Sequence, residues 1–511
     1  MTPIDFFHAA ALRYPDAPAA SELSADGQAT EHVTFRELAQ RVNSVAAAFQ
    51  RLSGSKRPRV AIACRNSMAM LESILAIYQC RGVLIPLTPK NPEAELRQQI
   101  TVACPDLIVL DQSAEILRTA QSVPVMFIGQ RKSDADFDVH AQIAQTTDSV
   151  PEIQEADSED IFAIKFTGGS SGRPKAVLQS ARCINTMVVS LRQVYKLRKS
   201  ERFLLSPPMT HGAGTFVLPV LAAGGCLLIM DGAKAGQLLD AMSLHDVSGT
   251  WVPPTLLYQM LDEQAIRPRT LQSLRNLLYG GAGATLERLQ QARELLGPVV
   301  GVTYGLTEAP VIIAGMPGDD GALNENLGSA GKAGPLTRLA VMRQDGSLCA
   351  AHELGEVVAR GDLLMSGYMD MPDETSQVLS GGWLRTGDIG YLDQRGYLFI
   401  KGRSKDVIIS GGFNVYPSDV EDVLARHDDV AESVVFGIPD AHWGERVEAV
   451  VELKQGRTSS NDALRTHVRE ALGAVRTPKT IHIIDQLPRS SLGKVQKRQL
   501  RDELIQKFRS A

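Results

Sequence analysis

The chain has 511 residues, of which 44% are hydrophobic and 22% are charged, and its formal net charge at pH 7 is −5. So long a globular chain exceeds what one hydrophobic core supports, and we expect two or more domains. The negative charge disfavours nucleic acid as a partner, because duplex binding needs clustered basic surface. The six cysteines form no C-x-x-C pair, which excludes a zinc ribbon or a thioredoxin-like site.

Cysteine usage and hydropathy also indicate a location. So few thiols in so long a chain are typical of the reducing cytoplasm, which is the predicted compartment. The most apolar stretch, residues 216–230, is interrupted by Pro219, Gly224 and Gly225 and is shorter than the roughly 20 residues of a membrane span. We therefore expect no membrane-spanning segment and interpret this stretch as buried core.

Short apolar runs alternate with segments of helical spacing over the first 400 residues. The pattern predicts helices at residues 35–52, 67–78 and 93–101, and strands at residues 60–63, 107–110, 125–128 and 227–230. This alternation favours an α/β architecture with largely parallel sheets, that is, a large N-terminal domain of layered α/β subdomains.

The pattern changes near residue 345. Strands are predicted at residues 356–359, 390–392, 397–400, 432–437 and 447–453, with a hairpin connection at 394–396 and helices at 417–426 and 461–472. We predict an N-terminal domain over residues 1–402, of which about 345–402 form a small β subdomain. A smaller, mobile α+β C-terminal domain follows over residues 403–511, and the few residues near 403–406 are short enough to act as a hinge.

Residues 167–175, TGGSSGRPK, combine three glycines, three hydroxyl side chains and a lysine. Glycine lets the backbone approach a phosphate closely, and successive N–H groups in such a turn form an anion-binding concavity. The ordinary P-loop is excluded, because Arg173 stands where its second glycine would be and Ala176 follows its lysine. The stretch suits the triphosphate of ATP, and taken alone it fits a polar surface loop equally well.

Further segments carry groups suited to a nucleotide. Residues 304–308, YGLTE, offer an aromatic plate for a base, a hydroxyl for a phosphate and a carboxylate for Mg²⁺, which takes one or two protein carboxylates when it is bound to ATP. The glycine turn at 278–283, LYGGAG, allows a flat adenine to approach, and 383–388, WLRTGD, ends on an aspartate suited to ribose hydroxyls. Each segment taken alone also fits an ordinary turn or a solvated charge.

The ordered set TGGSSGRPK, YGGAG, YGLTE, GWLRTGD, GRSKDVIISGGFNVYP and PRSSLGK resembles the adenylate-forming superfamily over about residues 5–505. That superfamily includes acyl- and aryl-CoA synthetases, nonribosomal-peptide adenylation domains and beetle luciferases. Two positions depart from its phosphate loop, because Gly168 replaces a serine and Ala176 replaces a glycine. Neither change removes the lysine or the glycine core, so we still expect catalysis.

The resemblance implies residue roles in nucleotide binding. The β- and γ-phosphates would be bound by Thr167, Gly168, Gly169, Ser170, Ser171, Gly172 and Lys175. The adenine would be bordered by Gly280, Gly281, Ala282 and Tyr304, and the ribose held by Asp388 and Arg403. Catalysis would use Thr307 at the α-phosphate, Glu308 as the Mg²⁺ ligand, Lys494 between the α-phosphate and the attacking carboxylate, and Lys405 at the hinge.

The resemblance also implies the acyl and thiol sites. His211 matches the position where CoA ligases carry an aromatic residue or histidine near the acyl group, and the pocket would be bordered by His211, Phe216, Gly281, Gly283 and residues 309–313. No aspartate stands between residues 207 and 216, which argues against an amino acid substrate. Gly411 and Gly412 would form a strand lining a pantetheine tunnel beside Trp443, with Lys90, Arg476 and Lys479 as weaker candidates for the CoA phosphates.

The sequence therefore predicts an AMP-forming acyl- or aryl-CoA ligase with ATP and CoA as co-substrates and Mg²⁺ as cofactor. Its partners would be small molecules, including a fatty or aromatic carboxylic acid. One alternative is a stand-alone adenylating enzyme that loads the phosphopantetheine thiol of a carrier protein. Another is a nucleotide-binding sensor with degraded chemistry, which the retained Lys175, Glu308, Asp388 and Lys494 disfavour.

Overall fold

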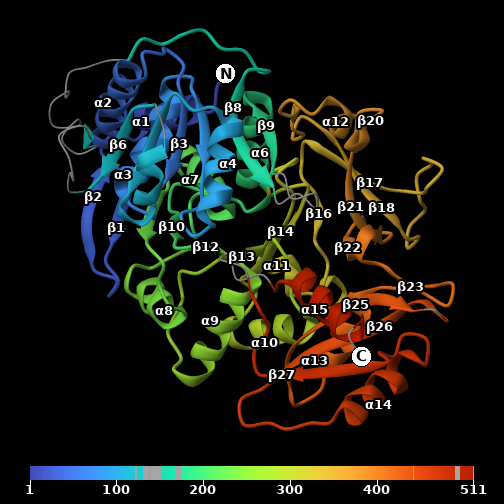
Figure 1. The fold of residues 1–511 in the computed structure, drawn as a ribbon. Coiled ribbons are helices and arrows are strands. Elements are labelled where there is room, and N and C mark those ends of the chain that lie inside the picture. Colours follow the sequence, from blue (N-terminus) through green and yellow to red (C-terminus); the bar gives the residue numbers. More distant parts are fainter. Residues whose placement is uncertain are drawn as a thin grey trace.

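The computed structural model describes residues 1–120, 123–129, 137–138, 151–167, 174–440, 442–489 and 495–509. These residues form four sheets and surrounding helices, which confirms the predicted α/β class. Figure 1 shows two large sheets in the N-terminal part, a smaller sheet beside them and a last sheet with its own helices near the C-terminus.

The first large sheet carries the hairpin that frames the predicted phosphate loop. Its strands are β3 (Arg59–Ala63), β4 (Val83–Pro86), β5 (Leu107–Asp111), β6 (Val125–Ile128), β7 (Phe137–Asp138), β8 (Ile161–Thr167), β9 (Lys175–Ser180) and β19 (Gly367–Tyr368). They lie in the order β19-β9-β8-β4-β3-β5-β6-β7. β8 pairs antiparallel with β9, and β9 with β19, while the pairs from β8 to β7 are parallel.

The second large sheet is parallel at its centre and antiparallel at its ends. Its strands are β1 (Pro18–Leu23), β2 (Ala29–Thr34), β10 (Arg202–Leu205), β11 (Cys226–Met230), β12 (Gly249–Val252), β13 (Asn276–Gly280), β14 (Val300–Tyr304), β15 (Ala314–Met316) and β16 (Lys332–Ala333). Their order is β16-β15-β14-β13-β12-β10-β11-β1-β2. The central strands are buried along their whole length, as expected for a sheet covered on both faces.

Helices cover the faces of the two large sheets, and some of them lie between the sheets. They are α1 (Asp5–Arg13), α2 (Phe35–Ser53), α3 (Met68–Gln79), α4 (Glu93–Ala103), α6 (Ala181–Val194), α7 (Val217–Ala222), α8 (Ala235–Leu244), α9 (Pro254–Ile266), α10 (Leu286–Leu296) and α11 (Gly318–Gly321), with 3₁₀ turns η1 (Gln112–Ala120), η2 (Gly212–Phe216) and η3 (Asn324–Asn326). Every residue of α3 is buried, as in a helix enclosed by protein on all sides. Residues 216–230 form the end of η2, α7 and β11 and are buried core, as predicted.

A third, mostly antiparallel sheet corresponds to the predicted β subdomain and begins slightly earlier than expected. It contains β17 (Thr337–Met342), β18 (Gly355–Gly361), β20 (Leu379–Ser380), β21 (Trp383–Leu392) and β22 (Leu398–Arg403), with α12 (Pro372–Val378) beside it. β21 is one strand of 10 residues, whereas the sequence predicted only its end. The turn between β21 and β22 forms the expected hairpin, closed by the hydrogen bond from Gly396 N to Asp393 O.

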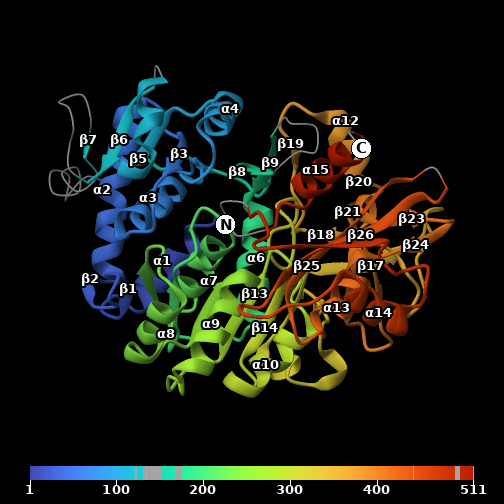
Figure 2. The ribbon, with the colours of Figure 1, turned by 60° about the horizontal axis from the view of Figure 1, so that its bottom comes forward.

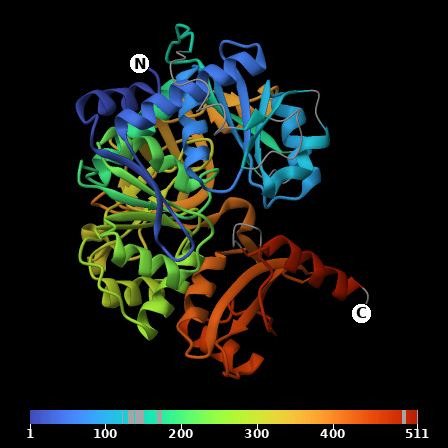
Figure 3. The ribbon, with the colours of Figure 1, turned by 90° about the vertical axis from the view of Figure 1, so that its left-hand side faces the viewer.

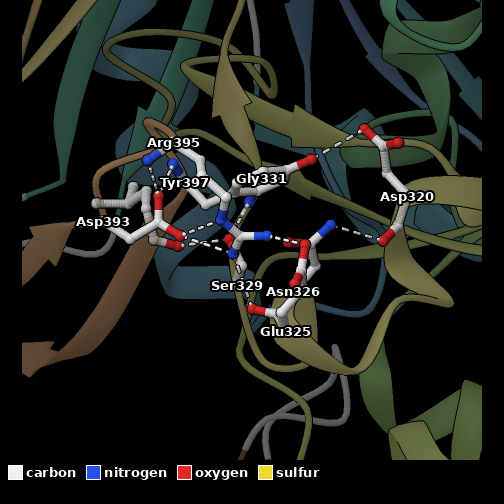
Figure 4. A network of polar contacts seen from close by, with 9 residues as sticks. Asp320, Glu325, Asn326, Ser329, Gly331, Asp393, Arg395 and Tyr397 are labelled. Carbon is white, nitrogen blue, oxygen red and sulfur yellow. Dashed lines mark hydrogen bonds and ion pairs between the residues drawn. The ribbon is translucent and has the colours of Figure 1, made fainter.

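A polar network joins this hairpin to the second large sheet (Figure 4). Arg395 Nη2 lies 2.7 Å from Asp393 Oδ2 within the hairpin and donates to the carbonyl oxygen of Glu325 at 3.0 Å. The Tyr397 hydroxyl donates to Asp320 Oδ2 at 3.3 Å. Buried groups complete the network: Asn326 donates to the Asp320 carbonyl, and Ser329 to the Leu398 carbonyl. The β21–β22 hairpin is thus fastened to the segment that precedes β16.

The last sheet begins directly after β22. The 3₁₀ turn η4 (Ser404–Asp406) leads into β23 (Ile408–Ser410), β24 (Phe413–Val415), β25 (Val430–Asp440), β26 (Gly444–Leu453) and β27 (Thr480–Ile484), with helices α13 (Pro417–Ala425), α14 (Asn461–Leu472) and α15 (Lys497–Arg509). α13 and α14 pack on one face of this sheet and α15 on the other (Figure 2). Figure 3 shows this part, in orange to red, as a lobe set apart from the two large sheets. The boundary at residues 402 and 403 stays a prediction.

Among the described residues, every helix is too short or too polar to traverse a lipid bilayer.

Candidate nucleotide and acyl site

The β8–β9 hairpin presents one polar and one apolar face. Thr167 and Lys175 are paired at its end, and residues 168–173 of the predicted phosphate loop lie outside the described residues. Side chains alternate along a strand, so Lys165 and Thr167 share a face with their register partners on β9, Val177 and Lys175, and with Gln179 further along that strand. The opposite face packs into an apolar cluster. The loop residues Gly168, Gly169, Ser170, Ser171 and Gly172 are therefore joined to a hairpin whose polar face is directed away from that cluster.

Lys175 and Glu308 meet at the same tyrosine. Lys175 Nζ lies 4.8 Å from the centre of the Tyr368 ring, and the Tyr368 hydroxyl donates to Glu308 Oε1 at 2.7 Å. Burial and the neighbouring Glu308 carboxylate raise the pKa of Tyr368, so its phenol stays protonated and acts as a donor. The predicted phosphate lysine thus contacts the ring, and the predicted Mg²⁺ ligand the hydroxyl, of one side chain on β19.

Asp388 connects the third sheet to the second. Its carboxylate is 5% exposed; Oδ2 accepts a hydrogen bond from the Tyr304 hydroxyl at 2.7 Å, and Oδ1 lies 2.9 Å from Arg403 Nε. Burial raises the pKa of Asp388, while the Arg403 guanidinium opposes that shift. Asp388 and Arg403 are direct partners in the β21–β22 register. The structure therefore brings together the residues predicted for the adenine face and for the ribose.

The glycine turn after β13 is packed tightly on one side and open on the other. A Cβ atom on Gly280 would lie 2.2 Å from Thr303 Oγ1, a hydroxyl that also accepts from Trp251 Nε1 at 3.0 Å. Gly281 has φ of +82°, a conformation that favours glycine. Ala282 and Gly283 follow in this turn, and a Cβ on Gly283 would meet nothing within 4 Å.

The loop after β14 folds back on itself beside this turn. Gln179 Nε2 donates to the Thr307 carbonyl oxygen at 2.8 Å, which ties the loop to β9. A Cβ on Gly305 would lie 2.5 Å from Val311 N, so the chain approaches itself too closely for a side chain there. Val311 has φ of +62°, which is rare for a β-branched residue and typical of strained functional segments.

His211 lies just before η2 and contacts two threonines. Its Nδ1 is 2.9 Å from Thr88 Oγ1 and 3.0 Å from Thr210 Oγ1. The Phe216 ring is fully buried and stacks on Phe203 with centroids 4.9 Å apart, and its place in the acyl pocket stays a prediction. The helix neighbours of Phe216 face a cavity.

That cavity holds about 490 Å³ of empty space, part of it open to solvent. It is lined by Ile74, Tyr78, Leu84, Pro86, Lys165, Gln179, Ile184, Met187, Met209, Thr210, Gly214, Thr215, Val217 and Leu218. Gln179 and Thr210 connect this cavity to the Thr307 loop and to His211. It is thus a candidate acyl site, lined by residues other than those predicted from the sequence.

The predicted thiol-site residues lie on the last sheet, with one correction. Gly411 and Gly412 do not form a strand; they make the turn between β23 and β24, with φ of +58° and +83°. Gly411 N donates to the Trp443 carbonyl oxygen at 2.8 Å. The Trp443 ring is 39% exposed, and Lys479 Nζ lies 4.5 Å from its centre.

The remaining predicted residues are not part of these clusters. Lys405 is exposed within η4, and Lys90 and Arg476 are exposed. Lys494 lies outside the described residues, in a segment whose ends meet through the Arg489–Val495 bridge.

Comparison with known proteins identifies the family. The AMP-binding enzyme model matches residues 7–369, and the model of the AMP-binding enzyme C-terminal domain matches residues 419–494. The chain belongs to the AMP-binding enzyme family. This confirms the predicted resemblance to the adenylate-forming superfamily and to its branch of acyl- and aryl-CoA synthetases.

Relatives of this AMP-binding enzyme span nearly its whole length. The medium/long-chain-fatty-acid–CoA ligase FadD8 of Mycobacterium tuberculosis is 29% identical over 92% of this chain and 85% of its own. The amide bond synthetase McbA of Marinactinospora thermotolerans superposes with a TM-score of 0.88 at 28% identity, covering 98% of this chain and 100% of its own. The o-succinylbenzoate CoA synthetase MenE of Bacillus subtilis, in complex with its acyl-adenylate intermediate, gives 0.85 at 27%, covering 97% and 98%.

Sequence reasoning missed three residues of this AMP-binding enzyme site. Tyr368 joins Lys175 to Glu308, yet it stands in no motif that could have signalled it. Gln179 fixes the Thr307 loop from four residues beyond Lys175. Lys165 interrupts the apolar run that precedes the phosphate loop, and a charge in such a run was the one available signal.

Proposed function

We propose that this chain is an ATP-dependent acid–thiol ligase. It activates a fatty or aromatic carboxylic acid as an acyl-adenylate, releases pyrophosphate and then transfers the acyl group to CoA. The observation that carries the proposal is the convergence of Lys175, Glu308 and Asp388 on Tyr368 and Tyr304, within a chain of the AMP-binding enzyme family. The named relatives include a fatty-acid–CoA ligase and a CoA synthetase with a bound acyl-adenylate.

Nucleotide roles follow from the placement of the side chains. In the proposal the phosphate-loop residues and Lys175 bind the β- and γ-phosphates, the turn at residues 280–282 and Tyr304 border the adenine, and Asp388 accepts from the ribose hydroxyls. Asp388 suits this role because its carboxylate is fixed by two donors and buried, so little freedom is lost on binding. The Arg403 guanidinium opposes the rise in the pKa of Asp388 that burial causes.

The chemistry consists of two transfers. A carboxylate oxygen of the acid attacks the α-phosphorus, the bond between the α-phosphorus and its bridging oxygen breaks, and pyrophosphate leaves. The CoA sulfur then attacks the acyl carbon, its proton is lost to solvent, and AMP leaves with the electron pair of the broken C–O bond. Both reactants of the first step are anionic, so cations and prearranged donors must offset their repulsion. We assign the offset of this repulsion to Lys494, and we place Thr307 at the α-phosphate and His211 beside the acyl group.

Glu308 fits a Mg²⁺ ion bound together with ATP. The described residues contain no group of three or more histidine, cysteine or acidic side chains that could hold a metal on their own. A single carboxylate is what an ATP-bound magnesium takes from a protein, the remaining positions being filled by phosphate oxygens and waters. Tyr368 orients Glu308 Oε1. When bound, the ion would reduce the negative charge of the phosphates.

CoA is the proposed acceptor rather than a carrier protein. Trp443 and Lys479 form an exposed aromatic and cationic pair beside the Gly411–Gly412 turn, which suits a phosphate-bearing thiol. In the proposal this face is carried to the acyl-adenylate by rotation of the residues after Lys405. The named relatives that accept CoA favour the same choice.

A pyrophosphate-release assay tests the function. The enzyme is incubated with ATP, Mg²⁺ and a panel of fatty and aromatic acids, and products are identified by mass spectrometry with CoA, with a phosphopantetheinylated carrier protein and with simple amines. We expect acyl-AMP with at least one acid and acyl-CoA as the thioester. The absence of pyrophosphate with every acid overturns the proposal, and transfer only to a carrier or an amine overturns the assigned acceptor.

The same assay tests Lys494. Lys494→Ala should lower the rate of acyl-AMP formation by about 10²–10³-fold, because one prearranged donor to developing charge is removed. Arg498→Ala serves as the control, since Arg498 is an exposed cation on α15 that pairs with Asp502. An adenylation rate of Lys494→Ala equal to that of the control contradicts the assignment.

A further inference from the structure

Lys165 is a charged residue in a strand that otherwise packs into the core. Ile164 and Phe166 on either side of it belong to the apolar cluster behind the hairpin. The alternation of the strand directs Lys165 the other way, toward the cavity that it lines with Gln179, Thr210 and Thr215. Its side chain is only partly exposed. Lys165 therefore faces this cavity, which is partly open to solvent, and not the apolar cluster.

The described residues provide no counter-charge for this lysine. Among the described residues, none forms an ion pair or a hydrogen bond with the Lys165 ammonium group, and the one charge effect on its pKa comes from Cys183. Burial raises the thiol pKa of Cys183 to about 12, so this thiol is neutral. Burial likewise raises the pKa of Tyr78 and lowers that of Lys165 itself. A cation without a partner in such a place is unfavourable unless a ligand supplies one.

The lining of the cavity divides into two kinds of surface. Apolar side chains make most of the wall, among them Ile74, Leu84, Met187 and Leu218. The polar groups are Lys165, Gln179, Tyr78, Thr210 and Thr215. An acid with a purely hydrocarbon body would leave Lys165 unpaired against it. A polar atom on the substrate, placed beyond the activated carboxylate, would meet the lysine.

The position of Lys165 relative to the reaction centre is fixed by the hairpin. Thr167, where the phosphate loop begins, lies two residues further along β8, which is about 7 Å in a strand. Gln179 and Thr210 of the same cavity contact the Thr307 loop and His211. The lysine is thus near the proposed site of acyl transfer, on the side where the cavity lies.

We infer that Lys165 is a specificity-determining residue, and that the acid has a second acceptor group, a carboxylate being the best match, which pairs with the Lys165 ammonium. This inference rests on the proposed function and narrows its substrate class to dicarboxylic or similarly substituted acids. The apolar wall holds the carbon skeleton between the two polar ends. Gln179, Thr210 and Thr215 supply further hydrogen bonds along the way.

Matched acid pairs test the inference. For each chain length, aliphatic and aromatic, the rate of pyrophosphate release is measured with the monocarboxylic acid, with its ω-carboxylate and with its ω-keto analogue. The panel is run with the native enzyme, Lys165→Met, Lys165→Arg and Lys234→Met. Lys165→Met keeps the volume and removes the charge, whereas Lys234 is exposed before α8 and controls for the loss of one lysine. Circular dichroism and unfolding midpoints establish that each variant folds.

We expect the native enzyme to prefer a substituted acid, and Lys165→Met to lose at least about 30-fold in kcat/KM for that acid, as on removal of one partner of a buried charge pair. The same variant should activate the matched hydrocarbon acid as well as or better than the native enzyme, and Lys165→Arg should retain part of the preference. Lys234→Met should match the native enzyme throughout.

Two outcomes overturn the inference while leaving the ligase function intact. In one, the native enzyme activates hydrocarbon acids as well as their substituted partners, and Lys165→Met changes neither. In the other, Lys165→Met slows every acid equally, which would place the lysine at the common reaction centre. If Lys165→Met does not fold, the inference is still tested by the preference of the native enzyme, and of Lys165→Arg, for substituted over hydrocarbon acids. No pyrophosphate release with any acid is instead a failure of the proposed function.

Discussion

At the scale of single residues, close packing fixes the candidate nucleotide site. Gly280 is placed so near Thr303 that no side chain fits, and Thr303 is held in turn by the Trp251 indole. The sequence signalled this glycine because strand-ending glycine turns suit a flat ligand. It could not signal Tyr368, because that residue reaches Glu308 only through the pairing of β19 with β9, which is far along the chain.

Gly280→Ala should therefore destabilise the fold by about 1–3 kcal/mol, because the new methyl group forces β13 away from β14. The measurement is the free energy of unfolding in urea. Gly283→Ala is the matched control in the same turn, since its Cβ would meet nothing within 4 Å. Equal free energies of unfolding of the two variants would show that Thr303 accommodates the new methyl group without loss of stability.

At the scale of elements, periodic segments were predicted well, whereas strand pairings other than the β21–β22 hairpin were not predicted. The predicted helix at residues 35–52 is α2, which begins with a capping box between Thr34 and Glu37 and ends at Gly54 with φ of +67°. The glycine turn at 411–412 was mistaken for a strand, because its neighbours on both sides are strands of three residues. Which strands pair, and that α3 is enclosed on all sides, depends on contacts between distant segments that periodicity does not encode.

The packing of α3 against α2 encloses a glutamate. Glu72 is fully buried; its Oε1 lies 3.1 Å from Arg41 Nη1, and its Oε2 has no hydrogen-bond partner among the described residues. Burial raises the pKa of Glu72 to about 7. The folded state therefore favours the protonated form, and the stability that this contributes is complete below the ordinary glutamate pKa and is lost as pH rises through about 7.

We expect this loss to be about 3 kcal/mol of the free energy of unfolding. Glu72→Gln cannot titrate, so the difference in stability between native and variant should shift in favour of the variant from pH 4.5 to pH 8. Urea unfolding at both pH values measures the shift, and Glu294→Gln, at an exposed position of α10, is the control. A difference that does not change with pH contradicts the raised pKa.

At the scale of the whole molecule, the transition from β22 to η4 is the proposed hinge. Lys405 lies in the middle of that 3₁₀ turn and is exposed, so its backbone is free of the packing that holds the flanking strands. The sequence predicts this junction through its charge pattern and the change of element type. It could not give the arrangement of the two parts, which depends on few contacts, such as Lys401 Nζ to Asp419 Oδ1 at 2.9 Å.

Lys405→Pro should impair thioester formation more than adenylation, because proline fixes φ and restricts the residue before it. Pyrophosphate release without CoA reports the first step, and acyl-CoA formation from supplied acyl-AMP reports the second. Lys405→Ala removes the side chain but leaves the backbone free, and should affect the second step less. An equal loss of both steps in Lys405→Pro argues against rotation at this residue.

The contacts around Arg395 have a consequence for the order of events. Because they anchor the β21–β22 hairpin to the segment before β16, Asp388 and Tyr304 belong to one unit. Under the proposed rotation that unit does not move. AMP would therefore stay bound to the same residues, Asp388 and Tyr304, while the residues after Lys405 rotate and present a different face to it. The intermediate would then never need to dissociate between half-reactions, and little of it should escape into the medium before thiolysis.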